Sequence, residues 1–213
     1  MMNATMANTI TSIAAEPFSL SLPLYGTIKL GTLASREGEE FSIWIGADMD
    51  VVDKLKAKSL DEADIDIQKN TSDRARFGEG SYEEWYSKDR TPFALLAPEG
   101  SLAAFVWFGP KPLGRPSLKY LSPEDRAKEL EQKEDVWHTL VYRSYAPYRG
   151  KGLMTDFVRF ATEKYKEHYP DAKLWVGMSA DNAGSASLAT KLGYNRRDDL
   201  YDGEKNWIAM TLE

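Results

Sequence analysis

A glycine-containing run between an apolar strand and a periodic helix constrains the fold of this chain more than any other feature. The run is Tyr148-Arg149-Gly150-Lys151-Gly152-Leu153. The stretch Val136–Tyr142 before it has the apolar content of a strand, and Gly152–His168 after it places apolar residues at helical spacing. Because Ala172–Met178 is typical of another strand, a strand-helix-strand crossover is predicted. Such a connection pairs its two strands in parallel.

The rest of the chain predicts more strands and helices around that crossover. Strands are expected where short apolar runs alternate with polar residues or are bounded by turn residues, at 20–33, 41–45, 91–97, 101–108 and 206–212. Helices are expected where apolar residues recur at helical spacing or a capping residue precedes them, at 50–63, 81–88 and 183–192. We therefore expect an α/β or mixed α+β fold in a single domain over 18–213, preceded by a flexible tail over 1–17.

Composition excludes several kinds of site. The chain has no cysteine, so disulfides, thiolate zinc sites and cysteine nucleophiles are excluded, and two histidines are too few for a multi-histidine metal site. No metal is therefore expected. The net charge of −6 argues against a nucleic-acid partner. No apolar run of about 18 residues predicts a membrane span, and the first 20 residues carry no Lys or Arg, so a cytoplasmic location is expected.

The glycine-containing run has the chemistry of an anion site. Gly150 and Gly152 let main-chain N–H groups approach an anion closely, and the start of the following helix adds unsatisfied donors and the positive end of its dipole. Arg149 and Lys151 add charge, so a diphosphate fits. The run lacks both the Walker sequence and the three spaced glycines of a dinucleotide-binding loop. An ordinary glycine turn before a helix is the alternative interpretation.

A second segment, Asp181–Tyr194, has a pattern of its own. It contains Asn182, a short helix and then the sequence Lys191-Leu192-Gly193-Tyr194, in which Gly193 suits the end of the helix. Taken alone, the segment fits an ordinary capped helix with a glycine stop.

Together the two segments resemble the GNAT superfamily of N-acetyltransferases. That family has an Arg/Gln-x-x-Gly-x-Gly/Ala loop, matched here at Arg149 and Gly152, whereas Met154 departs from the small residue at its end. The resemblance implies a twisted, mostly antiparallel mixed sheet with helices on both faces and a splayed parallel strand pair. It also implies an acceptor-side half at 18–135 and an acyl-CoA-binding half at 136–213. The implied cofactor-binding residues are Tyr142, Ser144, Arg149, Gly150, Lys151, Gly152, Leu153, Met154, Asn182 and Ser185.

The resemblance also implies a reaction. Acetyl-CoA, or another short acyl-CoA, would be the co-substrate, and the acyl group would pass directly to a primary amine of a small molecule or peptide within one complex. The acidic chain favours a cationic acceptor, for which the carboxylates near Tyr82 and Trp85 are candidates. The oligomeric state stays open, with a homodimer as one option.

The catalytic groups are harder to assign. The family's acidic tyrosine would stand at Ala189, so the candidate general acid becomes Tyr145, with Tyr148, Tyr194 or water as alternatives. The candidate base is His138, with Glu134 and Asp135 as alternatives, and main-chain N–H donors for the thioester oxygen are expected near Tyr142–Tyr145. Because Ala189 and Met154 depart from the family pattern, an acyl-CoA-binding module without catalysis is the alternative function.

Overall fold

The computed structural model describes residues 8–13, 19–114, 122–124 and 136–213. The chain divides into two compact units. The first comprises Met1–Trp107 and Tyr142–His168, and the second comprises Phe108–Val141 and Tyr169–Glu213. Strands β5 (Leu102–Pro110) and β6 (Trp137–Ser144) each begin in one unit and end in the other.

The strands of the first unit follow one another in the order β1-β2-β3-β4-β5-β6. Those not yet bounded are β1 (Thr9–Ser12), β2 (Thr27–Ala34), β3 (Glu40–Gly46) and β4 (Thr91–Leu96). The pairs β1/β2, β2/β3 and β3/β4 are antiparallel. The strand β1 lies inside the segment for which the sequence predicts a flexible tail.

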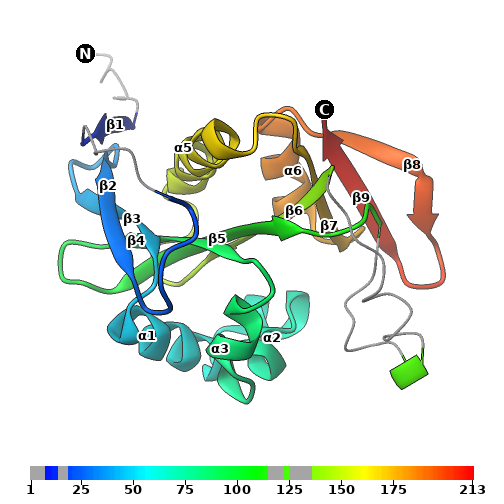
Figure 1. The fold of residues 1–213 in the computed structure, drawn as a ribbon, viewed down its shortest axis with the longest axis horizontal. Coiled ribbons are helices and arrows are strands. Elements are labelled where there is room, and N and C mark those ends of the chain that lie inside the picture. The colour runs from blue at the N-terminus through cyan, green and yellow to red at the C-terminus, as the bar shows by residue number, and fades with distance from the viewer. Residues whose placement is uncertain (1–7, 14–18, 115–121, 125–135) are drawn as a thin grey trace, which may run out of the picture. The chain divides into compact units, whose positions relative to one another are not determined.

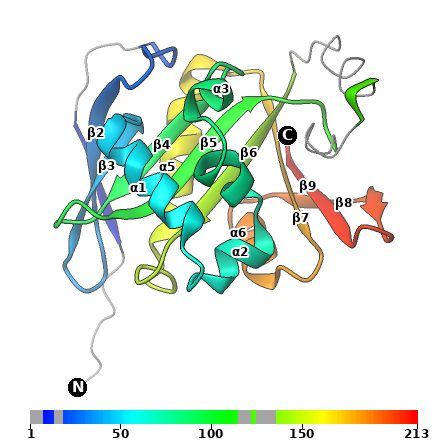
Figure 2. The same cartoon turned by 90° about the horizontal axis from the view of Figure 1, so that it is seen from below.

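Helices cover both faces of this part of the sheet. Figure 1 shows α5 on one side of the strands and α1, α2 and α3 on the other, and Figure 2 shows the same layers from below. Their bounds are Met49–Leu60 for α1, Ile65–Asn70 for α2, Tyr82–Tyr86 for α3 and Leu153–His168 for α5, with a π-helical turn η1 at Arg74–Gly78. Side chains cap three of them because their oxygens accept otherwise unsatisfied N–H groups. The capping residues are Asp48 for α1, Asp64 for α2 and Ser81 for α3.

An aromatic cluster fills the space between the sheet and the turn η1. Phe77 meets Trp85, Phe105 and Trp107 edge-on at centroid distances of 5.0, 6.2 and 5.7 Å. All four side chains are buried. Burying a large apolar side chain contributes on the order of 2 kcal/mol, so this cluster anchors η1 and α3 on the sheet.

The second unit contains the predicted parallel pair. Its strands lie in the order β5-β6-β7-β9-β8, with β7 at Lys173–Ser179, β8 at Asn195–Asp202 and β9 at Trp207–Leu212. The strands β6 and β7 pair in parallel from Trp137 opposite Lys173 to Thr139 opposite Trp175. Among the described residues the pairing goes no further, although both strands continue. The helix α6 (Ala183–Lys191) connects β7 to β8.

The predicted fold class is confirmed: the sheet is mixed and mostly antiparallel, with one parallel pair that separates and helices on both faces. The sequence did not predict β1, α2, η1 or β8. No helix within the described ranges is long and apolar enough to cross a membrane.

Candidate functional site

The loop before α5 has an open main chain at two glycines. Gly150 and Gly152 have φ angles of 78° and 77°, which residues with a Cβ adopt only with strain. A Cβ placed on Gly150 would meet no atom within 4 Å, and one placed on Gly152 would first meet Asn8 Nδ2 at 3.8 Å and then Arg36 Cζ at 4.0 Å. The space in front of Gly150 is therefore open, whereas the side chains of Asn8 and Arg36 lie at van der Waals distance in front of Gly152.

Most of the N–H groups that follow have no main-chain partner among the described residues, while the turn at Arg149–Gly150 directs that of Lys151 toward the carbonyl of Tyr148. Within the part of the chain that the structure describes, no hydrogen bond of ordinary geometry joins an N–H of Gly150–Met154 to a main-chain carbonyl. These groups precede or begin a 16-residue helix, whose N-terminus carries the positive end of its dipole. Such a loop has the chemistry to accept an anion.

The two cations of the loop, by contrast, already have partners. Arg149 donates to Asp64 Oδ2 at 2.6 Å, to Asp66 Oδ2 at 3.4 Å and from Nε to the carbonyl of Ser144 at 2.8 Å. Lys151 Nζ lies 2.8 Å from Glu39 Oε2, and Glu37 is its second carboxylate partner at 3.6 Å. The sequence correctly places positive charge at this loop, but carboxylates from distant segments offset that charge.

In these ion pairs the pKa shifts of Asp64 and Lys151 both favour the charged form. Burial would raise the pKa of Asp64, but the hydrogen bonds from Arg149 and from the N–H of Ile67 outweigh it and lower the pKa below its ordinary value. The hydrogen bond to Glu39 raises the pKa of Lys151. An anionic ligand must therefore compete with carboxylates for both cations.

A second ionic cluster lies beside this loop in the first unit. The side chain of Asp73 is fully buried and accepts from Arg143 Nε at 2.5 Å, from Arg143 Nη2 at 3.2 Å and from Arg76 Nη1. Both guanidinium groups also lie over the ring of Trp107, at 5.4 Å for Arg76 and 5.1 Å for Arg143. The cluster joins η1 to β6, and we interpret it as a structural ion pair with cation–π support.

The candidate acid Tyr145 is completely buried. Its Oη has no hydrogen-bond partner in the described residues, and burial holds the pKa of its hydroxyl well above the ordinary value, so the proton stays in place at neutral pH. Its N–H donates to the carbonyl of Ala103 at 3.0 Å, which removes it from the candidate oxyanion donors. The carbonyl of Tyr142 accepts from Arg143 Nη1. Tyr148 in the same loop donates its hydroxyl hydrogen to Glu99.

The remaining candidates lie in the second unit. Asn182 caps α6, because its Oδ1 accepts the N–H of Ser185 at 3.0 Å, and Gly193 ends the helix with a φ angle of 88°. Ala189, at the position of the family's tyrosine, is fully buried. The candidate base His138 is also buried, and its ring meets that of Tyr169 edge-on at 5.2 Å. Its catalytic role stays a prediction, and the alternatives Glu134 and Asp135 lie outside the described residues.

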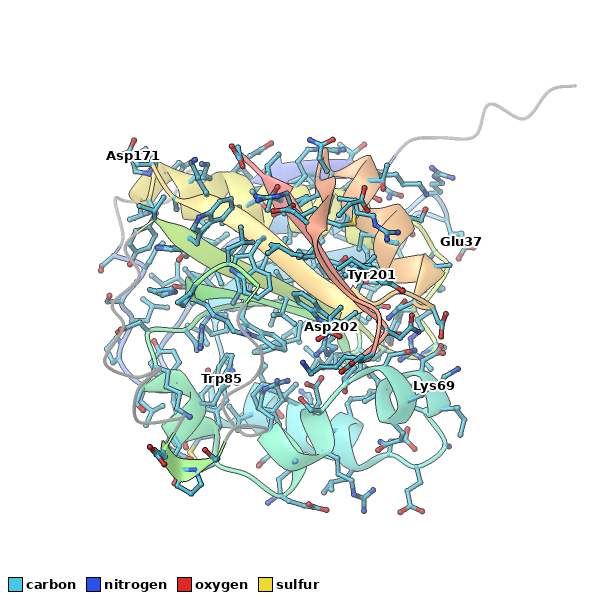
Figure 3. All side chains as sticks on the ribbon, turned by 90° about the vertical axis from the view of Figure 1, so that its right-hand side faces the viewer. Glu37, Lys69, Trp85, Asp171, Tyr201 and Asp202 are labelled. Carbon is cyan, nitrogen blue, oxygen red and sulfur yellow. The ribbon has the colours of Figure 1, made fainter. Side chains whose placement is uncertain are left out.

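The acidic group expected to hold an acceptor is already engaged. Glu83 accepts hydrogen bonds from Ser81 and Tyr25, which lower its pKa to about 2. Tyr82 is buried against its neighbours, and so is Trp85, which Figure 3 labels on α3. These contacts hold the loop before β2 against α3 and give no support for acceptor binding.

Sequence reasoning missed the two residues nearest to Gly152. Asn8 donates from Nδ2 to the carbonyl of Gly152 at 3.1 Å and to Asp156 Oδ2 at 2.9 Å. Arg36 lies on the turn between β2 and β3. The next residue in the chain, Glu37, is labelled in Figure 3. Asn8 and Arg36 are both more than 100 positions from the loop, so no local pattern could have linked them to it.

Comparison with known proteins identifies the fold. No protein-family profile and no curated protein sequence matches the chain. Solved structures do match. The GNAT domain of S. lividans PAT has a TM-score of 0.57 and 12% identity, covering 90% of this chain and 99% of its own. An acetyltransferase from Agrobacterium tumefaciens str. C58 has a TM-score of 0.56 and 12% identity, covering 94% and 99%.

A third match is RimL, named as a ribosomal L7/L12 alpha-N-protein acetyltransferase, with a TM-score of 0.52 and 13% identity over 82% of this chain and 89% of its own. At such low identity these likenesses establish the architecture alone. The chain has the GNAT fold.

Proposed function

We propose that this protein is an N-acyltransferase that moves an acetyl or other short acyl group from acyl-CoA to a primary amine. The observation that carries the proposal is that, within the described residues, no hydrogen bond of ordinary geometry joins an N–H of Gly150–Met154 to a main-chain carbonyl. These N–H groups lie on the loop at which the sequence resemblance implies that the donor's diphosphate would bind, and the GNAT fold supports that resemblance. A fold alone does not give a function, so the proposal depends on this loop.

The loop would hold the donor mainly through its main chain. The N–H groups of Gly150, Lys151 and Gly152 would bind phosphate oxygens, and those of Leu153 and Met154 would add the helix N-terminus. Bound acyl-CoA would supply a thioester carbonyl open to nucleophilic attack. Lys151 and Arg149 would contribute to the extent that the donor draws them from their carboxylates.

The acceptor must lose a proton before it can attack. An alkylamine has a pKa near ~10.4, so at neutral pH a base or a desolvating pocket is needed. We keep His138, Glu134 and Asp135 as the candidate bases. A cationic acceptor agrees with the net charge of −6.

The coenzyme A sulfur leaves as a thiolate, which a protein group can protonate as the bond to the acyl carbon breaks. The hydroxyl of Tyr145 has no competing partner among the described residues, and a phenol is protonated at neutral pH. It is therefore our proposed proton donor. A thiol has an ordinary pKa of about 8.5, so its thiolate can leave without first gaining a proton. Removing Tyr145 should therefore slow the transfer without abolishing it.

A second candidate function is acyl-CoA binding without transfer. Two observations favour it: Ala189 is fully buried where the resemblance places the acidic tyrosine, and carboxylates hold both cations of the loop. On this alternative the chain would bind acyl-CoA but release no free coenzyme A in the presence of amines.

Two measurements test the proposal. In a thermal-shift series at equal concentrations, acetyl-CoA should raise the melting temperature more than ATP or NAD, since a ligand that binds the folded state stabilises it. Release of the coenzyme A thiol is then followed with a thiol reagent over a panel of polyamines, amino acids and peptide N-termini. Amine-dependent release supports the enzyme, whereas stabilisation by acetyl-CoA without release for any amine supports the binding module. Stronger stabilisation by ATP or NAD would reject both.

A further inference from the structure

The turn between β2 and β3 brings an arginine to the glycine loop. Ser35–Glu39 forms this turn: the N–H of Ser35 donates to the carbonyl of Glu39 at 2.8 Å, and Ser35 Oγ accepts the N–H groups of Glu37 and Glu39 at 3.3 and 3.1 Å. Arg36 is exposed on this turn, with its Cζ 4.0 Å from the position a Cβ would take on Gly152. The turn therefore holds a guanidinium group at the open face of the loop.

The basic side chains around the loop differ in whether they have carboxylate partners. Arg149 has Asp64 and Asp66 as partners, and Lys151 has Glu37 and Glu39. No ion pair or hydrogen bond of the Arg36 side chain occurs among the residues that the structure describes. The same turn thus supplies carboxylates to Lys151 while it leaves its own cation available.

We propose that Arg36 supplies the positive charge that binds a phosphate group of the acyl-CoA donor. This inference rests on the proposed function. The planar guanidinium group can give two parallel N–H bonds to one phosphate, which makes arginine well suited to this role. Because Arg36 gives up no partner when it binds, it contributes its charge without the competition that Arg149 and Lys151 face. Arg36 is then a donor-binding residue contributed by the turn before β3.

The test measures coenzyme A binding by titration calorimetry with the wild type and with Arg36→Ala, Arg36→Lys and Arg74→Ala. Arg74 is the matched control, because it is also a partly exposed arginine of the first unit but pairs with Glu62 and Glu79. We expect Arg36→Ala to raise Kd by about tenfold or more, consistent with a lost charge-assisted contact, and Arg36→Lys to give an intermediate value. Arg74→Ala should stay within about twofold of the wild type, since an exposed ion pair contributes little.

Two further titrations, one with added salt and one with a truncated ligand, test whether the contact is ionic and which phosphate Arg36 binds. The affinity of the wild type should fall more steeply with added NaCl than that of Arg36→Ala, because screening weakens a contact that only the wild type makes. Titration with 3′-dephospho-coenzyme A identifies the phosphate. An equal loss on Arg36→Ala for both ligands assigns Arg36 to the diphosphate, and a loss confined to coenzyme A assigns it to the 3′-phosphate.

Failure of this inference can be told apart from failure of the proposed function. If the wild type binds coenzyme A and Arg36→Ala binds it within about twofold, Arg36 is not a phosphate ligand while the proposed function stands. If the wild type binds no coenzyme A, both are rejected. Because Arg36 is exposed and has no described partner, its variants should melt at the wild-type temperature, and this control shows that any loss of affinity is not a loss of folding.

Discussion

Arg149 Nη2 donates to Asp64 Oδ2 at 2.6 Å, so the cation that the resemblance assigns to the donor's phosphates is held by a carboxylate. The same carboxylate caps α2, because its other oxygen accepts the N–H of Ile67 at 3.1 Å. The side chain of Asp64 is only 2% exposed. Asp64 therefore joins the glycine loop to the start of α2, and under the proposed function it would link donor binding to that helix.

This linkage predicts that Asp64→Asn tightens coenzyme A binding. Asparagine caps helices about as well as aspartate, so the variant keeps the cap but removes the charge that competes for Arg149. We expect Kd to fall by about three- to tenfold, which corresponds to roughly 1 kcal/mol. Calorimetric titration measures it. Asp64→Ala is the companion variant: it also frees Arg149 but should cost about 1 kcal/mol of stability through the lost cap. An unchanged or weaker affinity in Asp64→Asn would show that the ion pair does not compete with the donor.

The glycine loop predicts a loss of binding on Gly150→Ala and Gly152→Ala. Each alanine strains a residue at positive φ by about 1 kcal/mol and places a methyl group where the ligand would approach the main chain. We expect Kd for coenzyme A to rise at least about tenfold. Gly114→Ala is the matched control, because Gly114 has a φ angle of 74° and lies in the second unit. It should lose similar stability and keep its affinity. Equal affinity in all three variants would place the ligand elsewhere.

The buried cluster at Asp73 predicts a large loss of stability on Asp73→Asn. The substitution leaves Arg143 and Arg76 without their shared carboxylate, and breaking a buried ion pair from one side costs about 3 kcal/mol or more. Urea denaturation measures the change. Glu79→Gln removes one partner of Arg74 in an exposed pair and should cost less than about 1 kcal/mol. If both variants lost the same stability, the cluster would not be an important stabilising contact.

The same cluster predicts acid sensitivity. Burial would raise the pKa of Asp73, but Arg143 and Arg76 outweigh it and lower the pKa below its ordinary value. A carboxyl group whose folded pKa is lowered stabilises the protein above its unfolded pKa of about 3.9, and this contribution is lost as the pH falls through the folded pKa. The free energy of unfolding should therefore be nearly flat from about pH 5 to 7 and fall below about pH 4. The fall should be smaller in Asp73→Asn, and equal falls in both proteins would contradict the assignment.

The unpartnered hydroxyl of Tyr145 predicts opposite effects on stability and turnover. Tyr145→Phe removes a buried polar atom that has no partner among the described residues, so stability should rise by about 1 kcal/mol. Because the variant also loses the proposed proton donor, kcat should fall about tenfold or more at an unchanged KM. Tyr148→Phe provides the contrast in stability: it removes the hydrogen-bond partner of Glu99, so its stability should not rise above that of the wild type. Full turnover in Tyr145→Phe would exclude Tyr145 as the acid.

The sequence predicted those elements whose own residues carry a clear signal. The sequence predicts the strand β3 because Phe41, Ile43 and Ile45 recur at period 2, and it predicts α5 because apolar residues repeat there at helical spacing. The strand β8 was missed because its sequence, Asn195–Asp202, is charged and has little apolar content. Pairing with β9 makes it a strand, and its charges suit the edge of a sheet.

The candidate site also combines features that local sequence predicts with contacts that it cannot predict. The positive φ angles at Gly150 and Gly152 and the cap at Asn182 follow from local sequence, and the structure shows all of them. The partners of Arg149 and Lys151 could not be predicted, because their carboxylates are 83 to 114 positions away in the sequence. Only the folded chain brings these charges together.

The most direct test of the account follows the main-chain amide signals of the isotopically labelled protein by NMR while coenzyme A is added. The largest shifts should fall on Gly150–Met154, whose N–H groups would change from solvent to phosphate as their acceptor. Adenosine without phosphates should leave these signals in place. If coenzyme A binds and the signals of Gly150–Met154 do not move, the glycine loop is not the diphosphate site and the proposed acyl transfer loses its basis.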